Sequence, residues 1–101
     1  MIARIWHGKT RIERYEEYTE FLKEVAIPDY KKTYGFIELT FLRNTKNNEA
    51  HFTLITYWDN LEVIKNFAGN DLEKAKYYPE DANFLLEYEE KVMHYEVFAK
   101  L

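Results

Sequence analysis

The sequence predicts an α+β domain in which one antiparallel sheet carries its helices on a single face. The chain has 101 residues, enough for one domain and too few for two. Runs rich in β-branched and aromatic residues alternate with segments whose apolar residues recur at steps of three and four. Along the chain, the strand-like runs and the helix-like segments follow the order strand, helix, strand, strand, helix, strand. We therefore expect residues 1–101 to form one domain.

Residues 2–7 are β-prone and predict a first strand that ends at Gly8. Thr10 and the glutamate three residues later have the spacing of a capping box. The next segment predicts an amphipathic helix, because its apolar residues share one face. These residues are Tyr15, Tyr18, Phe21, Leu22 and Val25. Pro28 is expected to end this helix or to begin a short final turn, and Gly35 to supply a left-handed exit.

Residues 36–43 and 50–58 predict two strands joined by the polar connector 44–49, a hairpin with a longer loop. Asp59, followed three residues later by glutamate, predicts the cap of a second helix. That helix points Leu61, Ile64 and Phe67 inward and stops near Gly69.

The C-terminal third predicts smaller elements. Asn70 and the glutamate three residues later predict a short helix that reaches Tyr77 and Tyr78 and breaks at Pro79. Residues 80–87 predict another short helical piece, and residues 91–98 the last strand. This order is that of the ferredoxin-like split βαβ fold, a four-stranded antiparallel sheet with helices on one face.

The two faces of the predicted sheet both carry large apolar side chains. In the first strand, Ile2 and Trp6 lie on one face and Ala3 and Ile5 on the other. Two helices cover only one face, and an antiparallel sheet with a wet face normally alternates more cleanly. We therefore expect a second copy of the chain to cover the other face in a twofold homodimer.

Composition excludes several functional classes. Only three Gly and two Pro exclude disordered and collagen-like chains, and the absence of Cys excludes disulfide frameworks, thiolate metal sites and cysteine nucleophiles. The net charge of −4 argues against nucleic acid and anionic membranes as partners. The start of the chain has no secretory pattern and no apolar run is long enough to span a bilayer, so the expected location is cytoplasmic.

Four segments resemble the antibiotic biosynthesis monooxygenase domain over essentially the whole chain. They are residues 1–8 (Met-Ile-Ala-Arg-Ile-Trp-His-Gly), 51–61, 77–81 (Tyr-Tyr-Pro-Glu-Asp) and 94–97 (His-Tyr-Glu-Val). The resemblance implies a dimeric α+β barrel in which two sheets pack face to face. Members of this family include cofactor-free oxygenases of aromatic polyketides, quinol oxygenases and haem-degrading oxygenases.

The haem-degrading branch is not matched at its functional positions. That branch uses an Asn, a Trp and a proximal His where this chain has His7, Phe67 and Tyr77. Because a tyrosine can ligate haem iron, a haem-binding relative that lacks the usual degrading residues stays open as an alternative. The main expectation needs no cofactor.

The candidate catalytic residues are His7 and Tyr77. His7 is expected to face the cavity between sheet and helices, where an imidazole can take a proton from a phenol near neutral pH. Tyr77 would orient the substrate. Phe67, Trp58 and Tyr78 would bind it, although tyrosines at a helix end and buried tryptophans serve more often in packing. His7, His51 and His94 show no spacing typical of ligands, so no metal site is predicted.

The adjacent carboxylates are expected to be solvated, since neighbouring side chains diverge on a helix or strand. These pairs are Glu16-Glu17, Glu80-Asp81 and Glu89-Glu90.

The sequence and the resemblance together favour a cofactor-independent monooxygenase that acts on a small aromatic or quinol-like substrate. The alternative is a small-molecule-binding or stress-response dimer with no chemistry of its own, since fold does not determine function. An RNA-binding domain of the same topology is excluded, because residues 50–58 contain no Gly, Lys or Arg.

Overall fold

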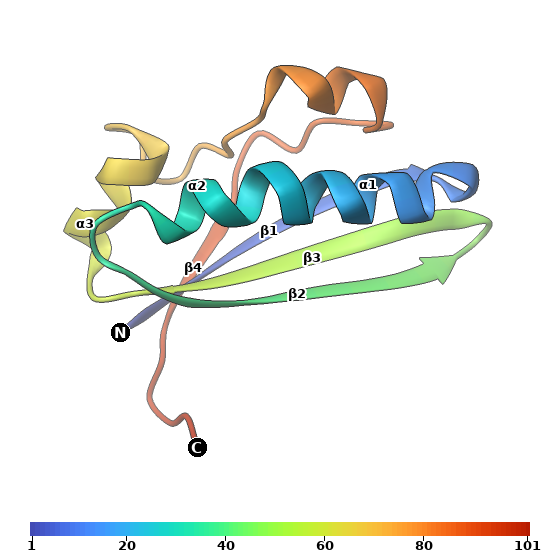
Figure 1. Cartoon of the computed structure of the whole chain (residues 1–101). Coiled ribbons are helices and arrows are strands. Elements are labelled where there is room, and N and C mark those ends of the chain that lie inside the picture. The colour runs from blue at the N-terminus through green and yellow to red at the C-terminus, as the bar shows by residue number, and fades with distance from the viewer.

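The computed structural model describes all 101 residues and shows one four-stranded sheet with its helices on one face (Figure 1). The strands are β1 (Ile2–Arg11), β2 (Phe36–Lys46), β3 (Glu49–Trp58) and β4 (Met93–Glu96). All neighbours are antiparallel, in the order β2-β3-β1-β4. The helices are α1 (Tyr15–Phe21), η2 (Leu22–Ala26), α2 (Ile27–Lys31) and α3 (Leu61–Ala68), with 3₁₀ turns η1 (Ile12–Arg14) and η3 (Pro79–Asn83). The predicted α+β, ferredoxin-like fold class is confirmed.

Strand β1 continues past Gly8, where the sequence predicted its end. The indole ring of Trp6 lies directly over Gly8, and a Cβ atom at this position would collide with that ring. Gly8 is therefore a packing position within the strand. Thr10 is buried near the end of the same strand, so it caps nothing, and η1 begins without a side-chain cap.

The first helical segment runs through Pro28 and does not end there. Elements α1, η2 and α2 follow one another as one rod above the sheet (Figure 1). Element η2 is a π-helical turn in which the Ile27 N–H bonds the Leu22 carbonyl, five residues earlier. This wider turn shifts the hydrogen-bond register just before a proline that lacks an N–H donor. Gly35 then leaves the helix with a φ of +93°, the predicted left-handed exit.

The hairpin between β2 and β3 has a two-residue turn instead of the predicted longer loop. Asn47 and Asn48 have φ angles of 53° and 61°, the left-handed conformation that a tight hairpin turn requires. The polar residues on either side of them pair across the two strands. Helix α3 forms as predicted, but its cap is Asn60, whose Oδ1 accepts the Val63 N–H at 3.0 Å. Ile64 and Phe67 face inward as predicted, whereas Leu61, in the first turn, is exposed and the prediction for it is wrong.

Residues 69–78 do not form the short helix that the sequence predicted. They run irregularly after Gly69, and Lys74 pairs in an isolated bridge with Lys91. The helical piece expected at residues 80–87 is the shorter η3, and β4 has four residues instead of eight.

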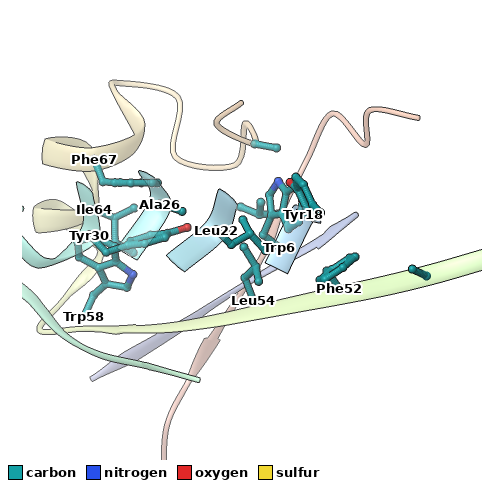
Figure 2. Close-up of a cluster of buried hydrophobic side chains, with 13 residues drawn as sticks. Trp6, Tyr18, Leu22, Ala26, Tyr30, Phe52, Leu54, Trp58, Ile64 and Phe67 are labelled. Atoms are coloured by element: carbon teal, nitrogen blue, oxygen red, sulfur yellow. The ribbon is translucent and has the colours of Figure 1, made fainter. Parts of the chain in front are cut away.

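The core lies between the helical rod and the sheet (Figure 2). Even-numbered residues of β1 and β3 face the helices, as the alternating burial of both strands shows. The other face of the sheet carries partly or fully exposed apolar side chains from all four strands. The register of strand pairing places these side chains next to one another. This outer face comprises Ile5, Leu42, Ile55, Tyr57, Met93 and Tyr95. No helix of the chain has the length and apolar character needed to cross a membrane.

Candidate small-molecule site between helix and sheet

A small void lies between the helical rod and the sheet, where the sequence predicted a cavity. Its volume is about 10 Å³, which is close to the space that one water molecule needs. Polar groups from distant parts of the chain surround it. They belong to Trp6, Tyr18, Tyr30, Lys76, Tyr78 and Asp81.

Trp6 contributes an unpaired donor to this void. The side chain is only 7% exposed, and its Nε1 is buried without a hydrogen-bond partner. In Figure 2 the ring stands beside Tyr18 and Leu22 of the helical rod. Buried polar atoms are nearly always paired, so this N–H is a feature that needs a physical explanation.

Asp81 places a buried carboxyl beside the same void. It is 2% exposed, and its two oxygens accept the Tyr18 hydroxyl at 2.9 Å and the Tyr78 backbone N–H at 2.7 Å. Burial raises the pKa of Asp81, although these two hydrogen bonds pull it back down in part. The prediction that Asp81 is solvated like its neighbour Glu80 is wrong. Pro79 opens a tight turn that directs Asp81 inward. The Tyr-Pro-Glu-Asp sequence of this turn is the signal from which the position of Asp81 could have been predicted.

A polar clasp closes the void on the side of α2. Asp29 accepts the Lys76 ammonium at 2.8 Å and the Tyr78 hydroxyl at 2.7 Å. Burial alone would raise the pKa of Asp29, but these bonds and the charges of Lys76 and Lys32 lower it overall. Lys76 and Tyr78 also border an outer pocket of about 490 Å³ that includes Pro28. The clasp therefore separates the inner void from this outer pocket.

His7 lies on the outer face of the sheet, not in the cavity where it was expected. Because β1 continues through Gly8, the odd-numbered His7 points away from the helices. Its Nδ1 is ion-paired with Glu89, and its Nε2 lies 3.2 Å from Nδ1 of His51. Glu89 is exposed, as expected for this carboxylate pair, and reaches His7 at the surface.

Tyr77 links the two faces at the edge of β1. Its ring packs edge-on against Trp6, with centroids 6.0 Å apart, and its hydroxyl donates to the backbone carbonyl of Glu89. Burial, followed by the nearby charge of Glu89, raises the pKa of Tyr77 to about 12. The structure thus brings His7 and Tyr77 together through Glu89.

The remaining predicted site residues form a second group. Trp58 is fully buried, and its Nε1 donates to Thr56 at 2.9 Å. Phe67 stacks on Tyr30 with centroids 4.3 Å apart, and its ring lies 4.1 Å from the Lys76 ammonium. Trp58 and Phe67 therefore support the wall near the clasp, and Tyr78 belongs to the clasp itself.

Arg4 anchors the irregular segment beside the site. Its buried guanidinium donates to the carbonyls of Leu72 at 2.6 Å and Lys74 at 3.0 Å and lies 3.0 Å from Nε2 of His94. Burial and the charge of Arg4 lower the pKa of His94. His94 shares a face with Arg4, whereas His7 and His51 lie on the other, and no group of three side chains is placed to hold a metal.

Comparisons with known proteins bear on the fold. No family model and no curated protein matches the sequence. The crystal structure of a mutant of MhuD, with two manganese protoporphyrin IX bound per active site, matches with a TM-score of 0.63 at 15% identity. This match covers 100% of this chain and 98% of that one.

A second crystal structure, of a proposed antibiotic biosynthesis monooxygenase from Bacillus cereus, matches with a TM-score of 0.54 at 15% identity. It covers 100% of this chain and 94% of the other. The chain has the antibiotic biosynthesis monooxygenase-like fold. The predicted resemblance is thus confirmed for the fold. The functional site is argued from the residues of this chain alone.

Replacing Asp81 tests its buried hydrogen bonds. Asp81→Ala leaves the Tyr18 hydroxyl and the Tyr78 N–H without their acceptor, so we expect it to lower the free energy of unfolding by about 3 kcal/mol. Glu80→Ala, at an exposed position next to it, should change the stability by less than about 0.5 kcal/mol. Urea titration measures both variants. Equal stabilities would show that Asp81 is solvated in solution.

The Arg4–His94 contact predicts a pH dependence of stability. The folded chain lowers the pKa of His94 below its ordinary value of 6.5, so the unfolded chain takes up the proton first as the pH falls. The free energy of unfolding should therefore decrease below about pH 6.5. His94→Gln keeps an acceptor for Arg4 without titrating and should flatten this decrease. Urea titrations from pH 7 to pH 5 measure it, and parallel curves would contradict the assignment.

Proposed function

We propose that the protein is a cofactor-independent monooxygenase that oxidises a small aromatic or quinol-like substrate, which reaches the void between the helical rod and the sheet from the outer pocket of about 490 Å³. The observation that carries the proposal is the buried carboxyl of Asp81, with its raised pKa, at the void between helix and sheet. A carboxyl with a raised pKa suits general acid–base work. The fold shared with a proposed monooxygenase supports the same reaction class.

The substrate is the only reductant in such a reaction. In an anthrone, a ring methylene loses two hydrogens and becomes a carbonyl, one atom of dioxygen enters the product and the other leaves as water. In a naphthoquinol, one atom of dioxygen enters at a ring C–H, the product is a hydroxyquinone and the other atom leaves as water. The first step removes a proton from the substrate, which makes the ring electron-rich enough to reduce dioxygen. Asp81 is the group at the void that would accept this proton, and the apolar walls from Leu22 and Leu54 exclude water.

Of the five site residues predicted from the sequence, only Tyr78 lines the void. The Tyr78 hydroxyl donates to Asp29 and so closes the void toward the outer pocket, and Tyr77 packs edge-on against the ring of Trp6. Phe67 forms the wall beneath Lys76, and Trp58 backs it. His7 is separated from the void by the sheet. It would act as a base only on a substrate bound at the strand edge beside Tyr77.

A non-catalytic small-molecule-binding protein is the second candidate, because the outer pocket of about 490 Å³ has room for a ligand and is not lined by Asp81. Native mass spectrometry discriminates the two functions. A bound aromatic compound that is unchanged after aerobic incubation would favour binding alone.

Haem fits the residues less well. The Tyr77 hydroxyl donates to a backbone carbonyl, and the pKa of about 12 keeps the phenol protonated.

Oxygen uptake with a panel of anthrones and naphthoquinols tests the proposed reaction. We expect turnover by the wild type and a loss of about 100-fold or more in Asp81→Asn, because the side chain no longer accepts a proton. Glu80→Gln is the matched control and should retain the rate. His7→Ala should retain most of the rate if the substrate lies at the void. Turnover on none of these substrates would contradict the proposal.

We also propose that the chain works as a homodimer through the outer face of the sheet. The C-terminal residues leave β4 on this side (Figure 1), where Lys100 pairs with Glu38 at 2.6 Å and lies over Tyr57. Phe98 in this tail is 98% exposed. Together with Ile5, Leu42, Ile55, Met93 and Tyr95, it forms apolar surface that a second copy would bury.

Sedimentation equilibrium at low micromolar concentration tests the dimer. We expect twice the chain mass of 12.3 kDa, with a melting temperature that falls on dilution. Met93→Glu on the outer face should raise the monomer fraction. Leu61→Glu, an exposed apolar position on α3, should not. A wild-type monomer whose melting temperature is insensitive to dilution would show that the outer face is free.

A further inference from the structure

We infer that the indole N–H of Trp6 donates a hydrogen bond to an oxygen atom of the bound ligand, a carbonyl or phenolate oxygen on an aromatic ring. This inference rests on the proposed function, because it assigns the chemical group that the same void receives. It also identifies a positioning residue that the sequence led us to regard as packing only.

The Trp6 N–H is chemically able to pair, and it is unpaired because the chain places no acceptor within reach of it. The other tryptophan of the chain, Trp58, is also buried, and its Nε1 finds an acceptor in Thr56 at 2.9 Å. Trp6 has the same N–H group, is likewise buried and has no acceptor within the chain. An N–H removed from water without a partner disfavours the folded chain. An acceptor supplied by a ligand removes this penalty.

Two packing contacts fix the orientation of the Trp6 ring that carries the N–H. The Trp6 ring lies over Gly8, where any side chain would collide with it, and Tyr77 packs edge-on against it. These two contacts hold the indole in one orientation beside the void. A fixed donor loses no rotational freedom when a ligand binds, so it can select one orientation of that ligand.

The void selects an oxygen acceptor. Its volume of about 10 Å³ admits one small atom or one water molecule, and the Lys76 ammonium at its border becomes free to meet an oxygen atom once its ion pair with Asp29 opens. A carbonyl or phenolate oxygen fits this combination of size and charge. The ring that carries the oxygen must lie toward the outer pocket of about 490 Å³, where Lys76 and Tyr78 now close the void. Binding therefore requires the clasp on Asp29 to open.

The indole N–H signals in a ¹⁵N-correlated NMR spectrum report this contact directly. The chain has two tryptophans, so two indole signals are expected, and the signal that disappears in Trp6→Phe is that of Trp6. The probes are 2-methyl-1,4-naphthoquinone and 2-methylnaphthalene, which share a ring system and differ in the two carbonyl oxygens. The quinone should move the Trp6 proton signal downfield, and the hydrocarbon should not. The Trp58 signal is the internal reference.

Affinity provides a second, independent measurement. Trp6→Phe removes the N–H and keeps an aromatic ring, so it should weaken quinone binding about five- to tenfold, the loss typical of one hydrogen bond. Its affinity for 2-methylnaphthalene should be unchanged. If Trp6→Phe does not fold, the wild-type spectra with the two probes still decide the question.

The outcomes separate this inference from the proposed function. If the quinone binds, but leaves the Trp6 signal in place or binds Trp6→Phe equally well, the inference is wrong and the aromatic site stands. Equal downfield shifts with both probes would also overturn it, because the hydrocarbon has no acceptor. If neither probe binds, both the inference and the proposed aromatic site are wrong, and the void holds water only.

Discussion

The packing of the Trp6 ring on Gly8 is the contact on which the rest of the site depends. Strand β1 pairs with β3 from Ile2 to Arg11, so Trp6 faces the helical rod and His7 faces the opposite side of the sheet. Gly8 leaves room for the Trp6 ring, which borders the small void between helix and sheet. The unpaired N–H and the Tyr77 contact both follow from this one ring position.

Buried polar contacts compensate for the lack of regular structure after α3. The segment that follows Gly69 has few backbone partners of its own. Arg4 binds two of its carbonyls, Asp29 binds Lys76 and Tyr78, and Asp81 binds Tyr18. Each contact joins this segment to the sheet or to the helical rod. Because burying such groups is favourable only when they are paired, the contacts hold the segment in one arrangement. That arrangement brings Lys76, Tyr78 and Asp81 to the void.

The candidate functional groups are divided between the two faces of the sheet. The helix side holds the void with Asp81 and Trp6, and the outer side holds His7, His51 and the apolar surface proposed for the dimer. Glu89 and Tyr77 connect the two sides around the edge of β1. A change in the packing of Tyr77 can therefore affect both sides at once.

The amino-acid sequence by itself determined the order of the elements and the fold class, because the alternation of strands and the amphipathic period of helices are local patterns. It also indicated Gly35 as a helix exit and Phe67 as an inward-facing residue. Only the tertiary structure decided that Asp81 also meets the Tyr18 hydroxyl, since the local Tyr-Pro-Glu-Asp turn indicates its bond to the Tyr78 N–H but not its partner on α1. The helix predicted after Asn70 is absent, because Arg4 takes the carbonyls of Leu72 and Lys74. The structure also decided the face occupied by His7: Trp6 lies over the backbone of Gly8 on the helix side, so His7 lies on the other, and residue periodicity does not encode which face the helices cover.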